Sequence, residues 1–488
     1  MNENINKSTV ISSLFWKTLE RGGAQGIQFI VQIILARLLL PADYGLIALI
    51  AIFIAVANVF VQSGFNTALI QKKEVDAIDL SSVFYASLVV SLILYMILFF
   101  TAPAIATFYN QPQLVNILRI LSITLFFGAF NSIQNAYIAR NMMFKKLFYS
   151  SFSATIISGI IGIVLAYRGF GVWALVAQQL ISQIMVSIIL SFIVKWRPQL
   201  LFSFDRLKKL FSYGSKLLIS NLLDTLYNNI SGLIIGAWYD SAMLGFYNRG
   251  RQFPELIVNN VNGSIQSVIF PALSSHQDDK KKIKQIMRRA IQTSSFIVFP
   301  MMVGLAATAE PIIKLLLTET WLPAVPFLQI FCISFALWPI HTANLQAINA
   351  IGRSDIFLKL EIIKKIIGVI IILFFIPFGA LGMAWGIVIS GIISTAINAS
   401  PNDKLLDYKY LEQIKDMLPN LMISLIMGCI VYALNWLNTS IIMILISQII
   451  IGTIIYIFLA IIFKVESANY LQKTIKEFMK SKKIKKYN

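Results

Sequence analysis

The stretch "FWKTLERGGAQGIQFIVQIILARLLL" at residues 15–40 combines a long apolar run with a regular series of polar side chains. Residues three or four positions apart lie on the same face of a helix. The polar residues follow one another at such spacings and predict a single stripe, made by Lys17, Arg21, Gln25, Gln28 and Gln32. A stripe of this kind in an apolar helix is typical of a membrane helix that turns one face toward a wet interior.

The composition of the whole chain agrees with a membrane protein. Of the 488 residues, 57% are hydrophobic and 13% are charged, and the mean hydropathy is +0.75. About fourteen apolar windows, each long enough to span a bilayer, follow one another with short connections. The first, seventh and eighth windows are polar enough for a hydropathy scan to drop them. The sequence therefore predicts an all-α integral membrane protein with about 14 transmembrane helices.

The basic residues indicate how the chain crosses the membrane. A net charge of +19 would favour a nucleic-acid partner in a soluble protein. With a cytoplasmic N-terminus, however, 31 Lys and Arg residues fall in the cytoplasmic connections and tails, and 5 fall in the opposite ones. This asymmetry follows the positive-inside rule. We therefore expect a multi-pass protein of the cytoplasmic (inner) membrane, with both termini in the cytoplasm and no nucleic-acid partner.

The chain also repeats itself at a shift of 200 residues. "PADYGLI" (41–47) aligns with "SAMLGFY" (241–247), and Gln28 and Gln62 align with Asn228 and Asn262. A weaker similarity links residues 169–176 with 380–388. Six windows separate the copies, so both have the same orientation, as in transporters built from parallel repeats. We expect two pseudo-symmetric six-helix lobes and two C-terminal helices, divided into an N-terminal lobe (1–195), a cytoplasmic linker with a surface helix (196–212), a second lobe (213–400), two helices (416–463) and a basic cytoplasmic tail (464–488).

Polar stripes occur in the corresponding helices of both copies. Because intramembrane polar groups normally face a bundle interior, four such helices predict a hydrated cavity between the lobes. The alternative is that the amides only join helices, at about 0.6 kcal/mol per hydrogen bond. The candidate lining residues are Gln25, Gln28, Gln62, Asn66, Asn228, Asn259, Asn262 and Gln266.

The charged residues in these helices have a small excess of positive charge. Lys17, Arg21, Arg249 and Arg251 outnumber Glu20, Asp224 and Glu255 by one. Arginine binds phosphate oxygens with two parallel hydrogen bonds and stays ionised when buried. The four cations are therefore candidate ligands for an anionic, phosphate-bearing substrate, and Asp224 and Glu255 are candidates for coupling to a proton or sodium ion. Lys17 can instead pair with Glu20 or reach the membrane surface, Arg249 and Arg251 can lie among the outer headgroups, and Asp224 can be a structural acid.

The sequence shows no sign of a catalytic or metal centre. Cys332 and Cys429 lie far apart, and neither His276 nor His341 has a second ligand at metal-binding spacing. The connections are too short to hold a catalytic domain. We therefore expect no catalytic residue, no metal and no cofactor, and a protein that is not an enzyme. His341 is expected to be hydrogen-bonded inside its bundle.

Four stretches resemble a known family. They are "LARLLLPADYGLIAL" (35–49), "SGFNTALIQKK" (63–73), "GFYNRGRQFPE" (245–255) and "AEPIIKLLLTETWLPAVPFLQI" (309–330). Together they resemble the Wzx-type polysaccharide flippases, such as colanic acid and teichuronic acid exporters, of the multidrug/oligosaccharidyl-lipid/polysaccharide exporter superfamily.

This resemblance implies a two-lobed, fourteen-helix transporter. The implied substrate is an undecaprenyl-pyrophosphate-linked oligosaccharide repeat unit, moved by alternating access for the synthesis of O-antigen, capsule or exopolysaccharide. In the related lipid II flippases, arginines of the first and eighth helices line a cationic cavity, and Arg21 and Arg251 lie in those helices here. The expected partners are this substrate and the bilayer, with a polymerase and glycosyltransferases nearby, and the expected state is a monomer. The rival functions are a multidrug or cation antiporter of the same superfamily and a polysaccharide polymerase or ligase.

Overall fold

The computed structural model describes residues 7–72, 74–194 and 196–470. These residues form helices and connections without a strand, so the all-α fold class is confirmed. The chain divides into two compact units, unit 1 (Met1–Gly245) and unit 2 (Phe246–Asn488).

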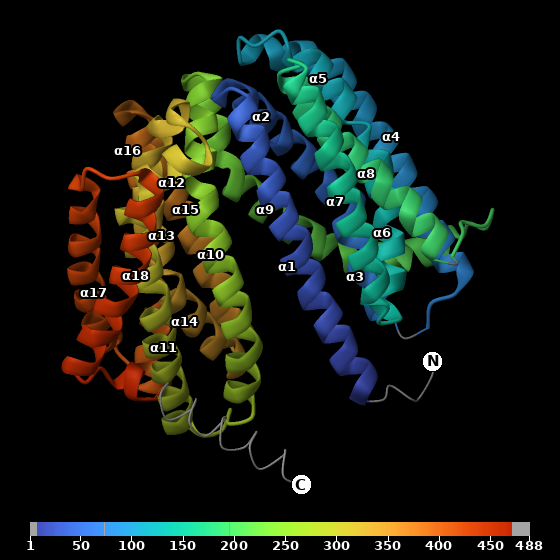
Figure 1. The fold of residues 1–488 in the computed structure, drawn as a ribbon. Helices are drawn as coiled ribbons and strands as arrows, with labels where there is room; N and C mark the ends of the chain where they lie inside the picture. Colours follow the sequence, from blue (N-terminus) through green and yellow to red (C-terminus); the bar gives the residue numbers. More distant parts are fainter. Residues whose placement is uncertain (1–6, 73, 195, 471–488) are drawn as a thin grey trace, which may run out of the picture. The chain divides into compact units, whose positions relative to one another are not determined.

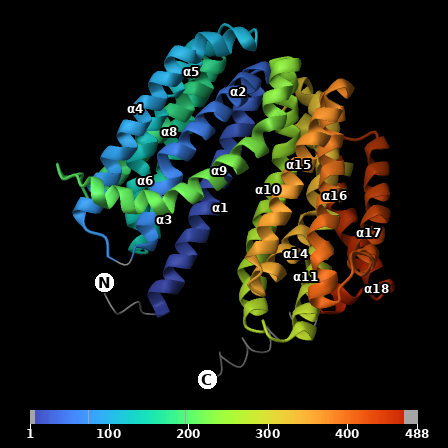
Figure 2. The same ribbon diagram turned by 180° about the vertical axis from the view of Figure 1, so that it is seen from behind.

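Unit 1 is a bundle of long helices that continues into α9 (Figures 1 and 2). Its elements are α1 (Lys7–Leu38), α2 (Pro41–Asn58), the π-helix η1 (Val59–Ser63), α3 (Gly64–Gln71), α4 (Ala77–Phe108), α5 (Leu114–Leu121), α6 (Thr124–Arg140), α7 (Phe144–Tyr167), α8 (Val172–Ile193) and α9 (Phe204–Trp238). Helix α7 packs between α1 and α8, whereas α9 packs on α2, η1, α3 and α4. Because α9 packs there, it belongs to unit 1. The boundary between the compact units lies after Gly245, C-terminal to α9, whereas the sequence predicted that the second lobe begins at residue 213.

Unit 2 holds the remaining helices. They are α10 (Ser241–Ser274), which begins in unit 1, α11 (Lys280–Ala307), α12 (Ala309–Leu316), η2 (Glu319–Ala324), α13 (Val325–Ala336), α14 (Trp338–Ala350), α15 (Ser354–Phe375), η3 (Ile376–Phe378), α16 (Gly379–Leu406), α17 (Tyr410–Ala433), η4 (Leu434–Trp436) and α18 (Ile441–Ile462). Helices α17 and α18 pack on each other and on α11 through buried Met427, Val431 and Tyr456. Of the predicted tail (464–488), residues 471–488 lie outside the described residues.

The 200-residue repeat reappears in the helix boundaries. Helices α1 and α9 end at Leu38 and Trp238, and α2 and α10 begin at Pro41 and Ser241. The matched glycines make reciprocal contacts: a Cβ on Gly45 would lie 1.7 Å from the Ser241 carbonyl oxygen, and one on Gly245 would lie 2.2 Å from that of Pro41. The two matched helix starts, at Pro41–Gly45 and Ser241–Gly245, thus contact each other reciprocally.

Ten segments of the described chain are long and apolar enough to cross a membrane. One of them, Ser354–Leu406, contains both α15 and α16. Helices α1, α9 and α10 are not among the ten, as expected from the polar residues in the first, seventh and eighth windows. The chain is therefore a multi-pass membrane protein, and the total of 14 spans stays a prediction.

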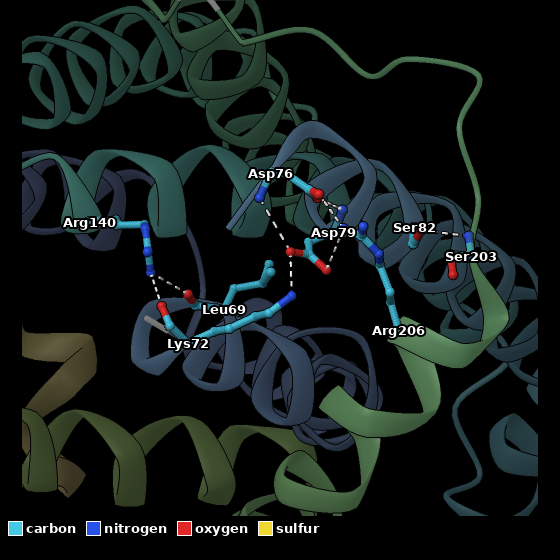
Figure 3. Close-up of polar contacts among 8 residues, drawn as sticks. All are labelled: Leu69, Lys72, Asp76, Asp79, Ser82, Arg140, Ser203 and Arg206. Atoms are coloured by element: carbon cyan, nitrogen blue, oxygen red, sulfur yellow. Dashed lines mark hydrogen bonds and ion pairs between the residues drawn. The ribbon is translucent and has the colours of Figure 1, made fainter. Parts of the chain in front are cut away.

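The connection between α8 and α9 is held to the beginning of α4 by hydrogen bonds and an ion pair (Figure 3). The Gln199 and Ser203 amides donate to the hydroxyls of Ser81 and Ser82, at 3.1 and 2.9 Å. Arg206, in the first turn of α9, forms an ion pair with Asp76. The surface helix expected within 196–212 is the first part of α9, which continues without a break from Phe204 to Trp238.

Two aspartates organise this cluster. Asp76 and Asp79 cap α4 reciprocally, each side chain accepting the backbone N–H of the other. Asp79 is buried, with Lys72 Nζ at 2.5 Å and Arg206 at 3.6 Å. Arg140 of α6 donates to the Leu69 and Lys72 carbonyl oxygens at the end of α3 (Figure 3). One cluster of charges therefore joins α3, α4, α6 and α9.

Candidate functional site

An uncharged polar cavity of about 480 Å³ lies inside unit 1 between α1, α2, η1, α6 and α8. Its walls carry amide side chains with a few hydroxyls, and none of the described residues that line it is charged. We call it the amide cavity. Its polar lining consists of Gln28, Gln32, Asn58, Gln62, Thr124, Gln178, Gln179, Ser182 and Gln183.

The π-helix η1 places Gln62 in the wall of the amide cavity. Such a turn widens the helix by one residue and is frequent at functional sites. Gln62 Nε2 donates to Asn58 Oδ1 at 3.0 Å. On the facing helix α6, a Cβ at Gly128 would lie 3.1 Å from the amide atoms of both residues. The absence of a side chain at Gly128 therefore leaves room for these amides.

Helix α8 supplies the opposite wall with Gln178, Gln179, Ser182 and Gln183. Gln178 Nε2 donates to Gln28 Oε1 at 3.4 Å, while the buried Gln178 Oε1 has no hydrogen-bond partner. Asn131 Nδ2 donates to Gln183 Oε1 at 3.2 Å, which fixes this glutamine. An amide offers both donors and acceptors, so the two walls can bind a ligand rich in hydroxyl groups.

The sequence analysis did not single out the α8 residues. Their signal is present, because Gln178 and Ser182, and likewise Gln179 and Gln183, are four residues apart and share one helix face. The predicted stripes lie in the helices that the repeat matches best, and α8 lies outside that part of the repeat.

A family model described as "Polysaccharide biosynthesis protein" matches residues 34–326, more than half of the chain. This chain belongs to that family. The chain is 24% identical to the succinoglycan biosynthesis transport protein ExoT of Rhizobium meliloti, over 75% of this chain and 74% of ExoT. It is 22% identical to the lipopolysaccharide biosynthesis protein WzxC of Escherichia coli, over 80% of each chain.

The fold of this polysaccharide biosynthesis protein is also found among solved transporters. The structure of the lipid II flippase MurJ in an inward closed conformation aligns with a TM-score of 0.75 and 18% identity. The alignment covers 92% of this chain and 98% of MurJ. The all-helical transporter fold implied by the resemblance in the sequence is therefore confirmed, and the number of fourteen helices stays a prediction.

The amide cavity of this family member contains two of the predicted lining residues, Gln28 and Gln62. Gln25 is exposed on α1 and does not line it. The side chains of Asn66 and Arg21 lie outside what the structure describes. Lys17 pairs with Glu20 at 3.6 Å and lies 5.1 Å from the Phe144 ring centroid, which agrees with the local pairing considered for it.

The other predicted residues of this protein lie on α9 and α10. Arg249 is buried over the Trp321 ring with Gln252 as its hydrogen-bond partner, an arrangement that favours a packing role. Arg251 and Glu255 form an ion pair at 3.1 Å and are both half-buried. The remaining predicted residues differ in exposure: Asn228, Asn259 and Gln266 are exposed, Asp224 is half-buried and Asn262 is buried. Their roles in substrate binding or ion coupling stay predictions.

Within the described residues, no group of three His, Cys, Asp or Glu side chains is arranged to hold a metal ion. The chemistry that the amide cavity offers is hydrogen bonding with neutral side chains.

Proposed function

We propose that this protein is a flippase that moves undecaprenyl-pyrophosphate-linked oligosaccharide repeat units across the cytoplasmic membrane by alternating access. The glycan would serve a surface polysaccharide such as O-antigen, capsule or exopolysaccharide. Membership of the polysaccharide biosynthesis family and the transport role in the name of the relative ExoT support this proposal.

The amide cavity gives the main structural support for a glycan substrate. Amide side chains can donate to and accept from the hydroxyl groups of a sugar at the same time. A volume of about 480 Å³ is within the range of small-ligand sites. A carboxylate would be expected in a site for a cationic drug, yet the described lining of this cavity contains only neutral side chains. The cavity therefore favours a glycan over the substrate of a multidrug antiporter.

We propose that the pyrophosphate is bound by cationic residues among those predicted from the sequence. Arg251 is the best defined of them, since it is half-buried and paired with Glu255. Its guanidinium can exchange this carboxylate for phosphate oxygens, which a guanidinium can bind with two parallel hydrogen bonds. Arg251→Ala should then lose export and Arg251→Lys should restore only part of it, because a point charge replaces a planar fork.

The remaining assignments follow from a transport role. Flipping a lipid-linked glycan makes and breaks no covalent bond, so we propose that the protein is not an enzyme. We further propose that it acts as a monomer beside a polymerase and glycosyltransferases, with both termini in the cytoplasm.

Amide substitutions test the glycan role of the cavity. Gln62→Leu and Gln178→Leu should each lower polysaccharide export about tenfold, the effect of ~1.4 kcal/mol of lost binding, while the protein stays at its normal level in the membrane. The measurement is surface polysaccharide in cells deleted for the chromosomal gene, together with the lipid-linked repeat unit left in the inner leaflet. Gln113→Leu, an identical change at an exposed position outside the cavity, is the control. Wild-type export by both cavity variants would reject the proposed function of this cavity.

A further inference from the structure

Helices α1 and α7 of unit 1 share a set of lysines and aromatic rings near their N-terminal ends. Lys17 of α1 lies 5.1 Å from the ring centroid of Phe144 on α7, and Lys145 of α7 lies 5.3 Å from that of Trp16 on α1. Each helix thus places a cation over a ring of the other helix, within the distance of a cation–π interaction. We call these four residues the lysine–ring seam.

Further aromatic side chains adjoin the lysine–ring seam. The Trp16 ring lies 5.6 Å from that of Phe148 and 6.0 Å from that of Tyr149, both about one turn further along α7. Tyr149 is 46% exposed, and Phe15, next to Trp16, is 59% exposed. Exposed rings of this kind are enriched where a membrane helix meets the headgroups, since they are apolar in body and can carry a polar tip.

Close packing of α1 on α7 fixes the two lysines relative to each other. A Cβ on Gly23 of α1 would lie 3.2 Å from Phe148 Cε2, and one on Gly159 of α7 would lie 2.5 Å from Val31 Cγ2. The two helices therefore approach each other closely at two levels on the same side of the seam. The lysines extend from a rigid pair of helices, and a ligand that binds both of them does not have to order the backbone first.

The position of the seam along its helices corresponds to a membrane surface. About 22 residues separate Trp16 from Leu38 at the end of α1, and Lys145 from Tyr167 at the end of α7, which is about 33 Å of helix in each case. The hydrocarbon core of a bilayer is about 30 Å thick. When the far ends of α1 and α7 lie at one surface, the seam lies at the other. With the predicted cytoplasmic N-terminus, this is the surface of the inner leaflet.

The described side chains around the seam carry more positive than negative charge. Lys17 pairs with Glu20 at 3.6 Å, whereas Lys145 is exposed and has no carboxylate partner among the described residues. Lys146, the next residue, donates to the Ile193 carbonyl oxygen at 3.1 Å, at the end of α8. One carboxylate therefore lies near three ammonium groups, and an anion at this surface is attracted by the uncompensated charge.

We propose that the lysine–ring seam binds the headgroup of an anionic phospholipid. Lys17 and Lys145 would bind its phosphate, and the rings would lie beside its glycerol and the first part of an acyl chain. Basic sites between transmembrane helices on the cytoplasmic side bind anionic headgroups. The depth of the seam and its exposed rings favour a lipid over a soluble anion. The bound lipid would join α7 to α1, which lines the amide cavity with Gln28 and Gln32. This inference does not depend on the proposed flippase function.

The direct test measures lipid binding by the purified protein. The protein is titrated with phosphatidylglycerol or phosphatidylcholine, and bound lipid is counted by native mass spectrometry. The affinity for phosphatidylglycerol should fall about fivefold in Lys145→Gln and about twentyfold in Lys17→Gln/Lys145→Gln, because each lysine contributes its own attraction to an anionic headgroup. Lys145→Arg keeps the charge and should bind as the wild type does. An unchanged affinity in the double variant would overturn the proposal.

A matched control separates a specific site from the effect of net charge. Lys208→Gln/Lys209→Gln removes two lysines from exposed positions on α9 and should leave the affinity unchanged. Equal losses in the two double variants would show that net charge alone attracts the lipid, which would overturn a site at the seam. A competition arm adds an isoprenyl-pyrophosphate-linked sugar. Tighter binding of this compound than of phosphatidylglycerol, lost in Lys17→Gln/Lys145→Gln, would overturn the assigned ligand.

Thermal unfolding gives a second measurement that needs no variant. A ligand that binds only the folded protein raises its melting temperature. Phosphatidylglycerol should raise the melting temperature of the wild type more than phosphatidylcholine does, and 1 M salt should reduce the difference, because charges exposed to solvent are screened (the Debye length falls to about 3 Å). Trp16→Leu removes the ring below Lys145 without changing the charge and should make the difference smaller. Equal melting temperatures of the wild type in both lipids would contradict the proposed site.

Discussion

At the scale of single residues, Gly128 shows how one missing side chain creates the amide cavity. Its Cβ position lies 3.1 Å from Asn58 Oδ1 and Gln62 Nε2, so any larger residue displaces these amides. Gly128→Leu should fill the space and lower export at least as much as Gln62→Leu. Gly128→Ala should have a smaller effect, because the two amide side chains can move by a few tenths of an ångström. Export by both variants at normal protein level is the measurement, and equal, wild-type export would contradict a functional cavity.

The reciprocal glycines of the repeat give a prediction about stability. A Cβ at Gly45 or Gly245 would overlap a backbone carbonyl oxygen, which cannot turn away as a side chain can. Gly45→Ala and Gly245→Ala should therefore each destabilise the protein by about 1–3 kcal/mol or more. Thermal unfolding of the purified protein measures this cost. Gly22→Ala, where nothing lies within 4 Å, is the matched control, and equal melting temperatures for all three variants would contradict the close contact.

At the scale of elements, the charge cluster that joins α3, α4 and α9 makes stability depend on pH. The Arg206 side chain, which hydrogen-bonds Asp76, is the main reason that the Asp76 pKa falls from 3.8 to about 2. A lowered folded-state pKa stabilises the protein above the unfolded value, and this stabilisation is lost as the pH falls from about 4 to about 2.

The matching experiment compares the wild type with Asp76→Asn in that pH range. The wild type should melt at a higher temperature above pH 4, and the difference should shrink toward pH 2 as Asp76 becomes protonated. The effect should be small because Asp76 is half-exposed. Asp79→Asn should cost more, because Asp79 is buried with Lys72 as its partner. A larger loss from Asp76→Asn than from Asp79→Asn would contradict the assigned order.

At the scale of the whole molecule, the distribution of basic residues predicts the topology. Reporter fusions after residues 75, 205, 280 and 488 should all have cytoplasmic activity, because each follows an even number of spans in the fourteen-helix arrangement. A fusion after residue 110, at the other end of α4, should report the opposite side and serves as the control. A periplasmic signal from any of the four would contradict this arrangement.

The sequence determined the features that depend only on the order of residues within one helix or along the chain. Apolar windows, the positive-inside asymmetry and the 200-residue repeat depend on composition and spacing, so the membrane class and the matched boundaries of α1 with α9 and of α2 with α10 could be predicted. The stripe of Gln28 and Gln32 was predicted for the same reason, since it follows from the pitch of a single helix.

Only the tertiary structure decided which helix faces meet. Gln178 joins Gln28 across 150 residues, Asn398 meets His341 across 57, and Arg206 reaches Asp76 across 130. Helical periodicity gives the direction of a side chain around its own axis, but not the neighbour toward which that face turns. The amide cavity exists only where several such faces converge, and for that reason the packing of the helices, rather than the spacing of residues along them, determines it.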